Sequence, residues 1–192
     1  MKVITHWALA FITSLVLVFA HYSDGTVVQT LRLKQFDLVQ QTDEPYVSRD
    51  IAILEIDEST IEQYGQWPWK RTVLADIVKK LRQSGAGIIV LPMVFSERDR
   101  LGGDIPFIET IAGNGVVIAQ TGSTQTDRNA VPRGVAKIGD PLPYLFEWPG
   151  MLGPIPLLGM NADGVGVVNT APEIDGVVRR VPFSNRCAQL SD

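Results

Sequence analysis

Residues 87–119 read GIIVLPMVFSERDRLGGDIPFIETIAGNGVVIA, and this stretch decides the fold. Its apolar runs at 87–91 and 116–119 are rich in isoleucine and valine, as are strands that are buried on both faces of a sheet. Between them, residues 104–112 place isoleucines at helical spacing. The stretch therefore predicts a strand, a helix and a second strand. Pro92 should end the hydrogen-bonding ladder of the first strand or put that strand at a sheet edge.

A similar pattern precedes this stretch. Residues 51–56, IAILEI, form a nearly continuous apolar run and predict a central strand. Ser59 and Glu62 have the spacing of a capping box at the start of a short helix. Thr72 is expected to cap a longer amphipathic helix that stops at Gly85. The order strand, helix, strand predicts a right-handed parallel crossover, repeated once along the chain.

The pattern changes after the third predicted strand. Residues 121–150 are rich in Gly, Pro, Asn and Thr, which indicates an exposed excursion. Asp163-Gly164 and Asp175-Gly176 are turn dipeptides, and the valine-rich runs 165–169 and 177–183 follow them as a predicted antiparallel pair. The expected fold class is α/β, with a mixed, mainly parallel central sheet, flanking helices and a C-terminal antiparallel hairpin.

The N-terminal segment has a different character. From Trp7 to Ala20 the chain reads WALAFITSLVLVFA without a charge, after Lys2. We expect residues 1–22 to be a transmembrane anchor, with a cleavable signal peptide as the alternative. Because a lysine at the start favours the cytoplasmic side, residues 23–192 should form a domain in the periplasm or outside the cell. The expected location is the inner membrane, with the N-terminus cytoplasmic.

Composition excludes several classes of function. The formal charge of −4 over 192 residues provides no basic face for nucleic acid. One cysteine cannot form a disulfide within the chain, and the two histidines, His6 and His21, lie in or beside the N-terminal apolar run. The body of the chain therefore lacks imidazole chemistry, and we expect no metal and no cofactor.

Several motifs, taken in order, resemble a known family. They are Ile53–Thr60, Tyr64–Arg71, Phe95-Ser96-Glu97-Arg98-Asp99 and Asp175–Pro182. In order and spacing they resemble the type-two CHASE domain, the cyclase and histidine-kinase associated sensory extracellular domain, from about Leu31 to Phe183. Pro92 stands where that family often has an aspartate, so a role for that acidic position cannot be transferred to this chain.

The resemblance implies a sensor and not an enzyme. The expected function is extracytoplasmic ligand sensing in a membrane-bound receptor whose output is an adenylate, guanylate or diguanylate cyclase, or a histidine or serine/threonine kinase. No such output follows Asp192, so the sequence is expected to be truncated at its C-terminus. The expected partners are a small-molecule or protein stimulus, the membrane and a second copy in a homodimer. Candidate dimer contacts are Leu31, Leu33, Phe36 and Leu38. Alternatives are a freestanding exported binding or dimerisation domain and, from another class, a carboxylate-dependent hydrolase.

Candidate site residues follow from the predicted topology, because ligands of parallel α/β sheets bind beyond the carboxyl ends of the strands. The ligand-binding candidates are Asp57, Glu58, Ser96, Glu97, Asp99 and Arg179. The carboxylates could hold a cation or an amine. In the alternative interpretation, Asp57 and Glu58 cap a helix, and Glu97 and Asp99 pair with arginines. Residues assigned to structural motifs are Trp67, Pro68, Trp69, Gly85, Phe95, Asp175 and Gly176.

Overall fold

The computed structural model describes residues 2–23, 25–42, 44, 47–125, 147–170, 172–179 and 186–187. The chain divides into two compact units. One unit comprises residues 1–54 with 172–179, and the other comprises residues 55–171 with 180–192. Each unit is described below by itself.

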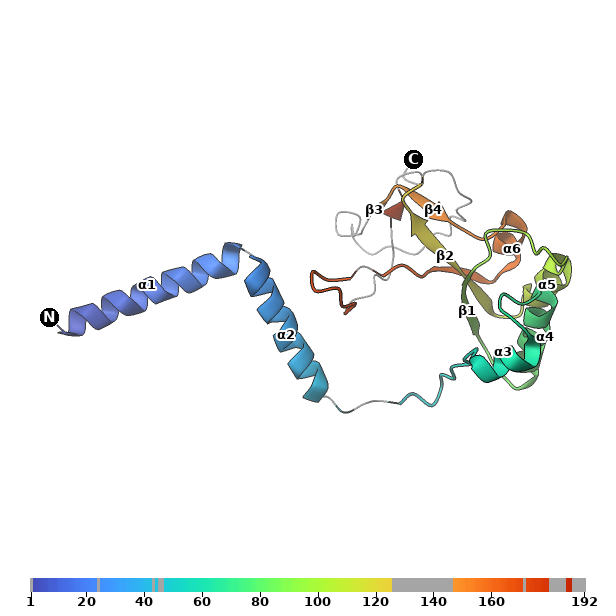
Figure 1. The fold of residues 1–192 in the computed structure, drawn as a ribbon, viewed down its shortest axis with the longest axis horizontal. Coiled ribbons are helices and arrows are strands. Elements are labelled where there is room, and N and C mark those ends of the chain that lie inside the picture. Colours follow the sequence, from blue (N-terminus) through green and yellow to red (C-terminus); the bar gives the residue numbers. More distant parts are fainter. Residues whose placement is uncertain are drawn as a thin grey trace. The chain divides into compact units, whose positions relative to one another are not determined.

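The second unit contains a small mixed sheet built around one strand (Figure 1). β2 (Val116–Ser123) pairs in parallel with β1 (Ile89–Val94) and with β5 (Gly164–Val167), and its last residues pair antiparallel with β4 (Gly150–Leu152). A further parallel pair joins β3 (Glu147–Trp148) to β6 (Arg186–Cys187). The expectation of a mixed, mainly parallel sheet is confirmed.

β1 shows the effect expected of its proline. Among the described strands β1 pairs with β2 alone, so it lies at an edge of the sheet. The register shifts between Leu91 and Val94, the stretch that contains Pro92. A proline has no amide hydrogen to donate to a ladder, so an irregular stretch at a sheet edge is where it is tolerated.

Helices cover one face of this sheet. They are α4 (Arg71–Gln83), α5 (Asp104–Ile111) and α6 (Pro156–Asn161), and α3 (Glu58–Tyr64) precedes them without a buried side chain of its own. Ile89 and Leu91 of β1 are buried beneath them, whereas Val90 between these residues is 63% exposed. The expected helices exist, and α4 stops where predicted, because Gly85 adopts a φ of +94° that favours glycine.

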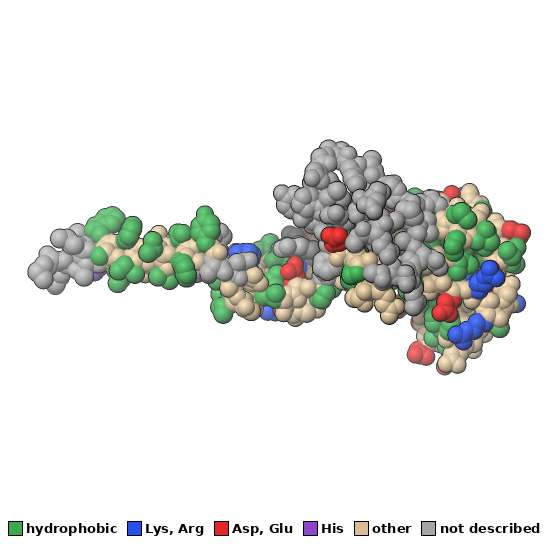
Figure 2. Space-filling model, turned by 90° about the horizontal axis from the view of Figure 1, so that it is seen from above, with side chains coloured by type: hydrophobic (Ala, Val, Ile, Leu, Met, Phe, Trp, Pro, Cys, Tyr) green, Lys and Arg blue, Asp and Glu red, His purple; other side chains and the backbone are tan. Residues whose placement is uncertain are grey.

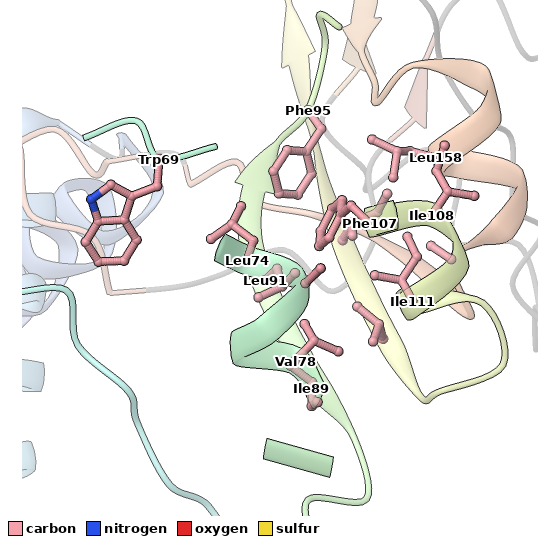
Figure 3. Close-up of a cluster of buried hydrophobic side chains, with 14 residues drawn as sticks. Trp69, Leu74, Val78, Ile89, Leu91, Phe95, Phe107, Ile108, Ile111 and Leu158 are labelled. Carbon is pink, nitrogen blue, oxygen red and sulfur yellow. The ribbon is translucent and has the colours of Figure 1, made fainter. Parts of the chain in front are cut away.

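The core lies between the helices and the strands (Figure 3). Val78 of α4, Phe107 and Ile111 of α5 and Leu158 of α6 have no measurable exposure. The rings of Phe95 and Phe107 meet edge to face with centroids 5.3 Å apart. Each fully buried side chain of this size contributes about 1.5–3 kcal/mol relative to exposure, so the core fixes the positions of α4 and α5 on the sheet.

The prediction of a strand at 51–56 is wrong. These residues adopt no regular structure, and Ile51, Ile53 and Leu54 are 71%, 91% and 65% exposed. An apolar run shows that a segment favours burial, but a strand also needs a neighbouring strand whose backbone groups face its own. The capping box is also wrong, because Asp57 and not Ser59 caps α3.

The predicted C-terminal hairpin is wrong for its described part. β5 lies parallel to β2, and residues 177–179 form no strand. Instead, the amide of Glu173 donates to the carbonyl of Val177 at 3.0 Å across a turn. β5 can approach β2 because it carries glycines: a Cβ at Gly164 would lie 3.1 Å from the Val117 side chain. Residues 180–183 of the predicted hairpin lie outside the described residues.

The first unit contains the helices α1 (Lys2–Ser23) and α2 (Thr26–Thr42). Figure 2 shows hydrophobic side chains along α1, and Trp7, Phe11 and Phe19 are at least 70% exposed. A helix is therefore present where the anchor was expected. Its role as a membrane span is not confirmed, because within the described residues no helix combines the length and the apolar character that crossing a membrane requires.

Candidate functional site

The loop that joins β1 to α5 is organised by Asp99. One carboxylate oxygen, Oδ2, accepts from the amides of Arg71 at 2.9 Å and Gly103 at 3.0 Å, and Oδ1 accepts from the amide of Leu101 at 3.0 Å. Lys70, the residue before α4, makes no side-chain capping bond. Asp99 therefore caps α4 from a loop 28 residues further along the chain.

Gly103 makes this close approach sterically feasible. A Cβ at this position would lie 2.6 Å from Oδ2 of Asp99 and 2.9 Å from the amide nitrogen of Thr72. The start of α4 and the start of α5 therefore meet at one carboxylate, with no room for a side chain at residue 103.

The lowered pKa of Asp99 suits a carboxylate that accepts hydrogen bonds from backbone amides. Burial raises the pKa of its carboxyl group, but the hydrogen bonds from the Arg71, Leu101 and Gly103 amides, together with the charge of Arg71, outweigh burial and lower the pKa overall. The group is therefore ionised at neutral pH, as a capping carboxylate should be.

Arg71 is the second centre of the same network. Its side chain is 8% exposed, and its guanidinium donates to the Asp104 carboxylate and to the carbonyl oxygen of Glu97. The guanidinium carbon also lies 5.2 Å from the centre of the Phe95 ring. Asp104 in turn accepts from the amide of Asp99 at 3.2 Å. The charges of Arg71 and Asp104 are thus paired with each other.

The structure brings together some of the predicted site residues. Ser96, Glu97 and Asp99 lie in the loop after β1, where Ser96 is half-buried and the Glu97 side chain is exposed. Asp57 instead accepts from the amide of Thr60 and the hydroxyl of Ser59, both at 2.9 Å, at the start of α3. Glu58 is the exposed first residue of that helix.

Hydrogen bonds from Thr60 and then Ser59 lower the pKa of Asp57 to about 2. This geometry matches the capping alternative considered for Asp57. The assignment of the six candidates as ligand-binding residues stays a prediction.

Arg179 belongs to the first unit, where it joins two carboxylates. Its Nε and Nη2 donate to Asp37 of α2 at 2.7 and 2.9 Å, and its Nη1 and Nη2 donate to Asp175 at 2.8 and 2.7 Å. These bonds raise the pKa of Arg179 and, from the other side, lower that of Asp175. The turn at Asp175-Gly176 is thereby fixed to α2. Arg180 lies outside the described residues.

The Trp67-Pro68-Trp69 segment packs under α3. Trp69 is 8% exposed, and its indole nitrogen donates to the carbonyl of Gly65 at 2.7 Å. Its ring lies 5.5 Å from the rings of both Tyr64 and Trp67. These contacts correspond to loop packing, the structural role that the sequence favoured for this motif.

Sequence reasoning missed a groove between α4 and α5. It has a volume of about 400 Å³, and its polar lining includes Lys79 and Arg82 of α4, Glu109 and Thr110 of α5, and Asn114. The signal in the sequence was weak, because these lysine and arginine residues had the spacing of a solvated helix face. In the part of the chain that the structure describes, no cluster of His, Cys, Asp and Glu side chains could hold a metal ion.

One comparison with known proteins agrees with the motifs. The sequence matches the model of the CHASE2 domain over residues 11–190. No curated protein and no solved structure matches the chain. CHASE2 domains are non-catalytic sensory domains, usually extracytoplasmic parts of signalling proteins. Since the match spans nearly the whole sequence, the chain belongs to the CHASE2 domain family.

Proposed function

We propose that the chain is the extracytoplasmic ligand-sensing domain of a membrane-bound signalling receptor whose output is a cytoplasmic cyclase or kinase. The observation that carries this proposal is the family match over residues 11–190. A sensor domain needs a stimulus that binds one of its conformations better than another, because only differential affinity shifts a conformational equilibrium.

The electrostatics favour a binding domain over the hydrolase alternative. A glycosidase-like mechanism needs one carboxyl group with a raised pKa, so that it stays protonated and acts as a general acid. The pKa values of Asp57 and Asp99 are instead lowered by hydrogen bonds from their own loops. These carboxylates are suited to holding backbone amides and unsuited to donating a proton.

The first helix supports the membrane part of the proposal. Large apolar side chains such as Trp7, Leu9 and Phe11 are each at least 65% exposed along α1. Each would gain about 1.5–3 kcal/mol on full transfer from water to an apolar environment. We therefore propose that α1 holds the protein at the inner membrane, with Lys2 on the cytoplasmic side and the rest outside.

The Arg179 bonds suggest how a signal leaves the domain. Residues 172–179 follow β5 along the chain, and Arg179 ties them to Asp37 of α2. α2 begins at Thr26, shortly after α1 ends at Ser23, so a displacement of this turn would act on the helices nearest the membrane. Leu31 and Leu38 are each 65% exposed on α2, and we propose them as contacts between two copies of the chain.

Topology in living bacteria tests this proposal. The full chain, fused at its C-terminus to alkaline phosphatase or to green fluorescent protein, should give active phosphatase, non-fluorescent green fluorescent protein and protein in the membrane fraction. A matched variant without residues 7–20 should reverse all three results. A fluorescent, soluble full-length fusion would contradict an extracytoplasmic sensor.

A further inference from the structure

We propose that the groove between α4 and α5 is the ligand site of this sensor, and that it takes a small zwitterion carrying a carboxylate and an ammonium group, as a free amino acid does. This inference rests on the proposed function, because it names the stimulus class of the same domain. The predicted site residues do not line this groove.

The two walls of the groove differ in charge. Lys79 and Arg82 stand three residues apart on α4, so they lie on the same face of that helix. Glu109 lines the groove from α5. The lining thus offers two cationic groups on one wall and one carboxylate on the other. A ligand with one negative and one positive end pairs with both walls. A simple anion would pair with the cations but would be repelled by the carboxylate of Glu109.

Lys79 is free enough to serve a ligand. Its ammonium lies 3.6 Å from Asp76, and both side chains are more than half exposed. An exposed pair of this kind contributes little to stability, so an incoming carboxylate can replace it.

Hydrogen bonds to backbone carbonyl oxygens hold the other polar side chains in place. Nη1 of Arg82 donates to the carbonyls of Ala86 at 2.6 Å and Gly87 at 2.8 Å, and the hydroxyl of Thr110 donates to the carbonyl of Pro106 at 2.7 Å. The side-chain nitrogen Nδ2 of Asn114 donates to the carbonyl of Thr110 at 2.9 Å. These side chains are already ordered, so binding requires less ordering of the protein.

The size of the groove and its apolar lining fit a ligand of this class. A volume of about 400 Å³ lies at the lower end of the range of small-molecule sites. Pro106, which is exposed, provides apolar surface beside the charges. A side chain of the ligand can pack there while its charged ends meet the two walls.

The test uses the purified full chain and three single variants. Lys79→Gln removes one cation, Glu109→Gln removes the carboxylate, and Lys80→Gln is the matched control. Lys80 is an exposed lysine next to Lys79 on the same helix, and it does not line the groove. All three changes are at exposed positions, so the melting temperatures without ligand should stay close to that of the unmodified chain.

Each standard L-amino acid is first tested at millimolar concentration for a rise in melting temperature, because a ligand that binds only the folded state stabilises it. Calorimetry then gives the Kd of any amino acid that binds, together with its N-acetyl and carboxamide derivatives. We expect binding to the unmodified chain and to Lys80→Gln, and Kd values about tenfold higher for Lys79→Gln and Glu109→Gln, as the loss of one charge-assisted hydrogen bond predicts.

Three results would overturn the inference. If an amino acid bound all four proteins equally, the sensor function would stand and the site would lie elsewhere. If the N-acetyl or carboxamide derivative bound as well as the parent compound, the ligand would not be recognised as a zwitterion. If no amino acid bound, the ligand class would be wrong, while the topology experiment would still decide the proposed function separately.

Discussion

Replacing Asp99 by alanine tests the main structural finding of the loop after β1. The carboxylate accepts from the backbone amides of Arg71, Leu101 and Gly103 at 2.9–3.0 Å. One of these amides starts α4 and another immediately precedes α5. Asp99→Ala therefore removes the acceptor for three amides at once and uncouples the starts of two helices.

The magnitude follows from these three bonds. Loss of a capping side chain costs about 1 kcal/mol of stability, and each of the other two bonds contributes about 0.5–1.5 kcal/mol. Together the three lost bonds would cost about 2–4 kcal/mol of stability if water could not reach the freed amides. Asp99 is only partly buried, so water can solvate the freed amides and screen the charge, and we expect about 2 kcal/mol. For a chain of this size the melting temperature should fall by about 4–8 °C.

The pH dependence has a definite sign. The pKa of Asp99 in the folded chain lies below its ordinary value of 3.8, so the unfolded chain binds the proton more readily. The stabilisation is therefore fully present above about pH 4 and is lost as the pH falls through the lower, folded-state pKa. The difference in melting temperature between the unmodified chain and Asp99→Asn should stay constant at neutral pH and shrink below about pH 4.

Circular dichroism melting curves at several pH values check both statements. Asp76→Asn is the matched control, because Asp76 is an exposed aspartate on α4 whose side chain is 69% exposed. Its melting temperature should change by about 1 °C or less. The capping argument fails if Asp99→Ala melts with the unmodified chain, or if the difference for Asp99→Asn is unchanged in acid.

Three further predictions concern other contacts. Phe107→Ala, at a ring with no measurable exposure, should cost about 3–5 kcal/mol in denaturant unfolding, and a cost below about 1 kcal/mol would contradict the packing of α5. Gly122→Ala would place a Cβ in steric conflict with the Trp148 ring and should cost about 1–3 kcal/mol, measured as a lower melting temperature. An unchanged melting temperature would refute the contact. Arg179→Gln leaves Asp37 and Asp175 without their shared cation, so amide hydrogen exchange in α2 should become faster. Exchange in α4, which belongs to the other unit, should not change. If exchange in α2 were as slow as in the unmodified chain, this ion pair would not hold the helix.

Local patterns in the sequence predicted the helices and the strands β1 and β2 well. α4 has a strong amphipathic period, with Leu74 and Val78 buried. The helix ends before Gly85, whose positive φ favours glycine. β1 and β2 are apolar runs on either side of a helix, and they do pair in parallel. In each case the information lies within one continuous stretch of the sequence, so the sequence alone was sufficient.

Predictions failed where the structure depends on residues far apart in the chain. Residues 51–56 have the composition of a strand, yet pairing depends on which backbone is adjacent, and composition does not encode that neighbour. The cap of α4 was assigned to Thr72 because a cap is normally local, but Asp99 provides it from another loop. β5 was predicted to form a hairpin from its turn dipeptides, whereas its glycines allow it to lie against Val117 of β2.

The same chemistry explains why the candidate site was difficult to predict. A carboxylate after a strand can hold a ligand, but the next element is a helix whose first amides need an acceptor, and the two roles require the same residue type. Asp57 and Asp99 take the second role, with lowered pKa values as the result of their hydrogen bonds. Carboxylates committed to amides of their own chain have fewer lone pairs left for a stimulus. Charged groups that line a groove and remain exposed, such as Lys79 and Glu109, are therefore better candidates for contact with a ligand.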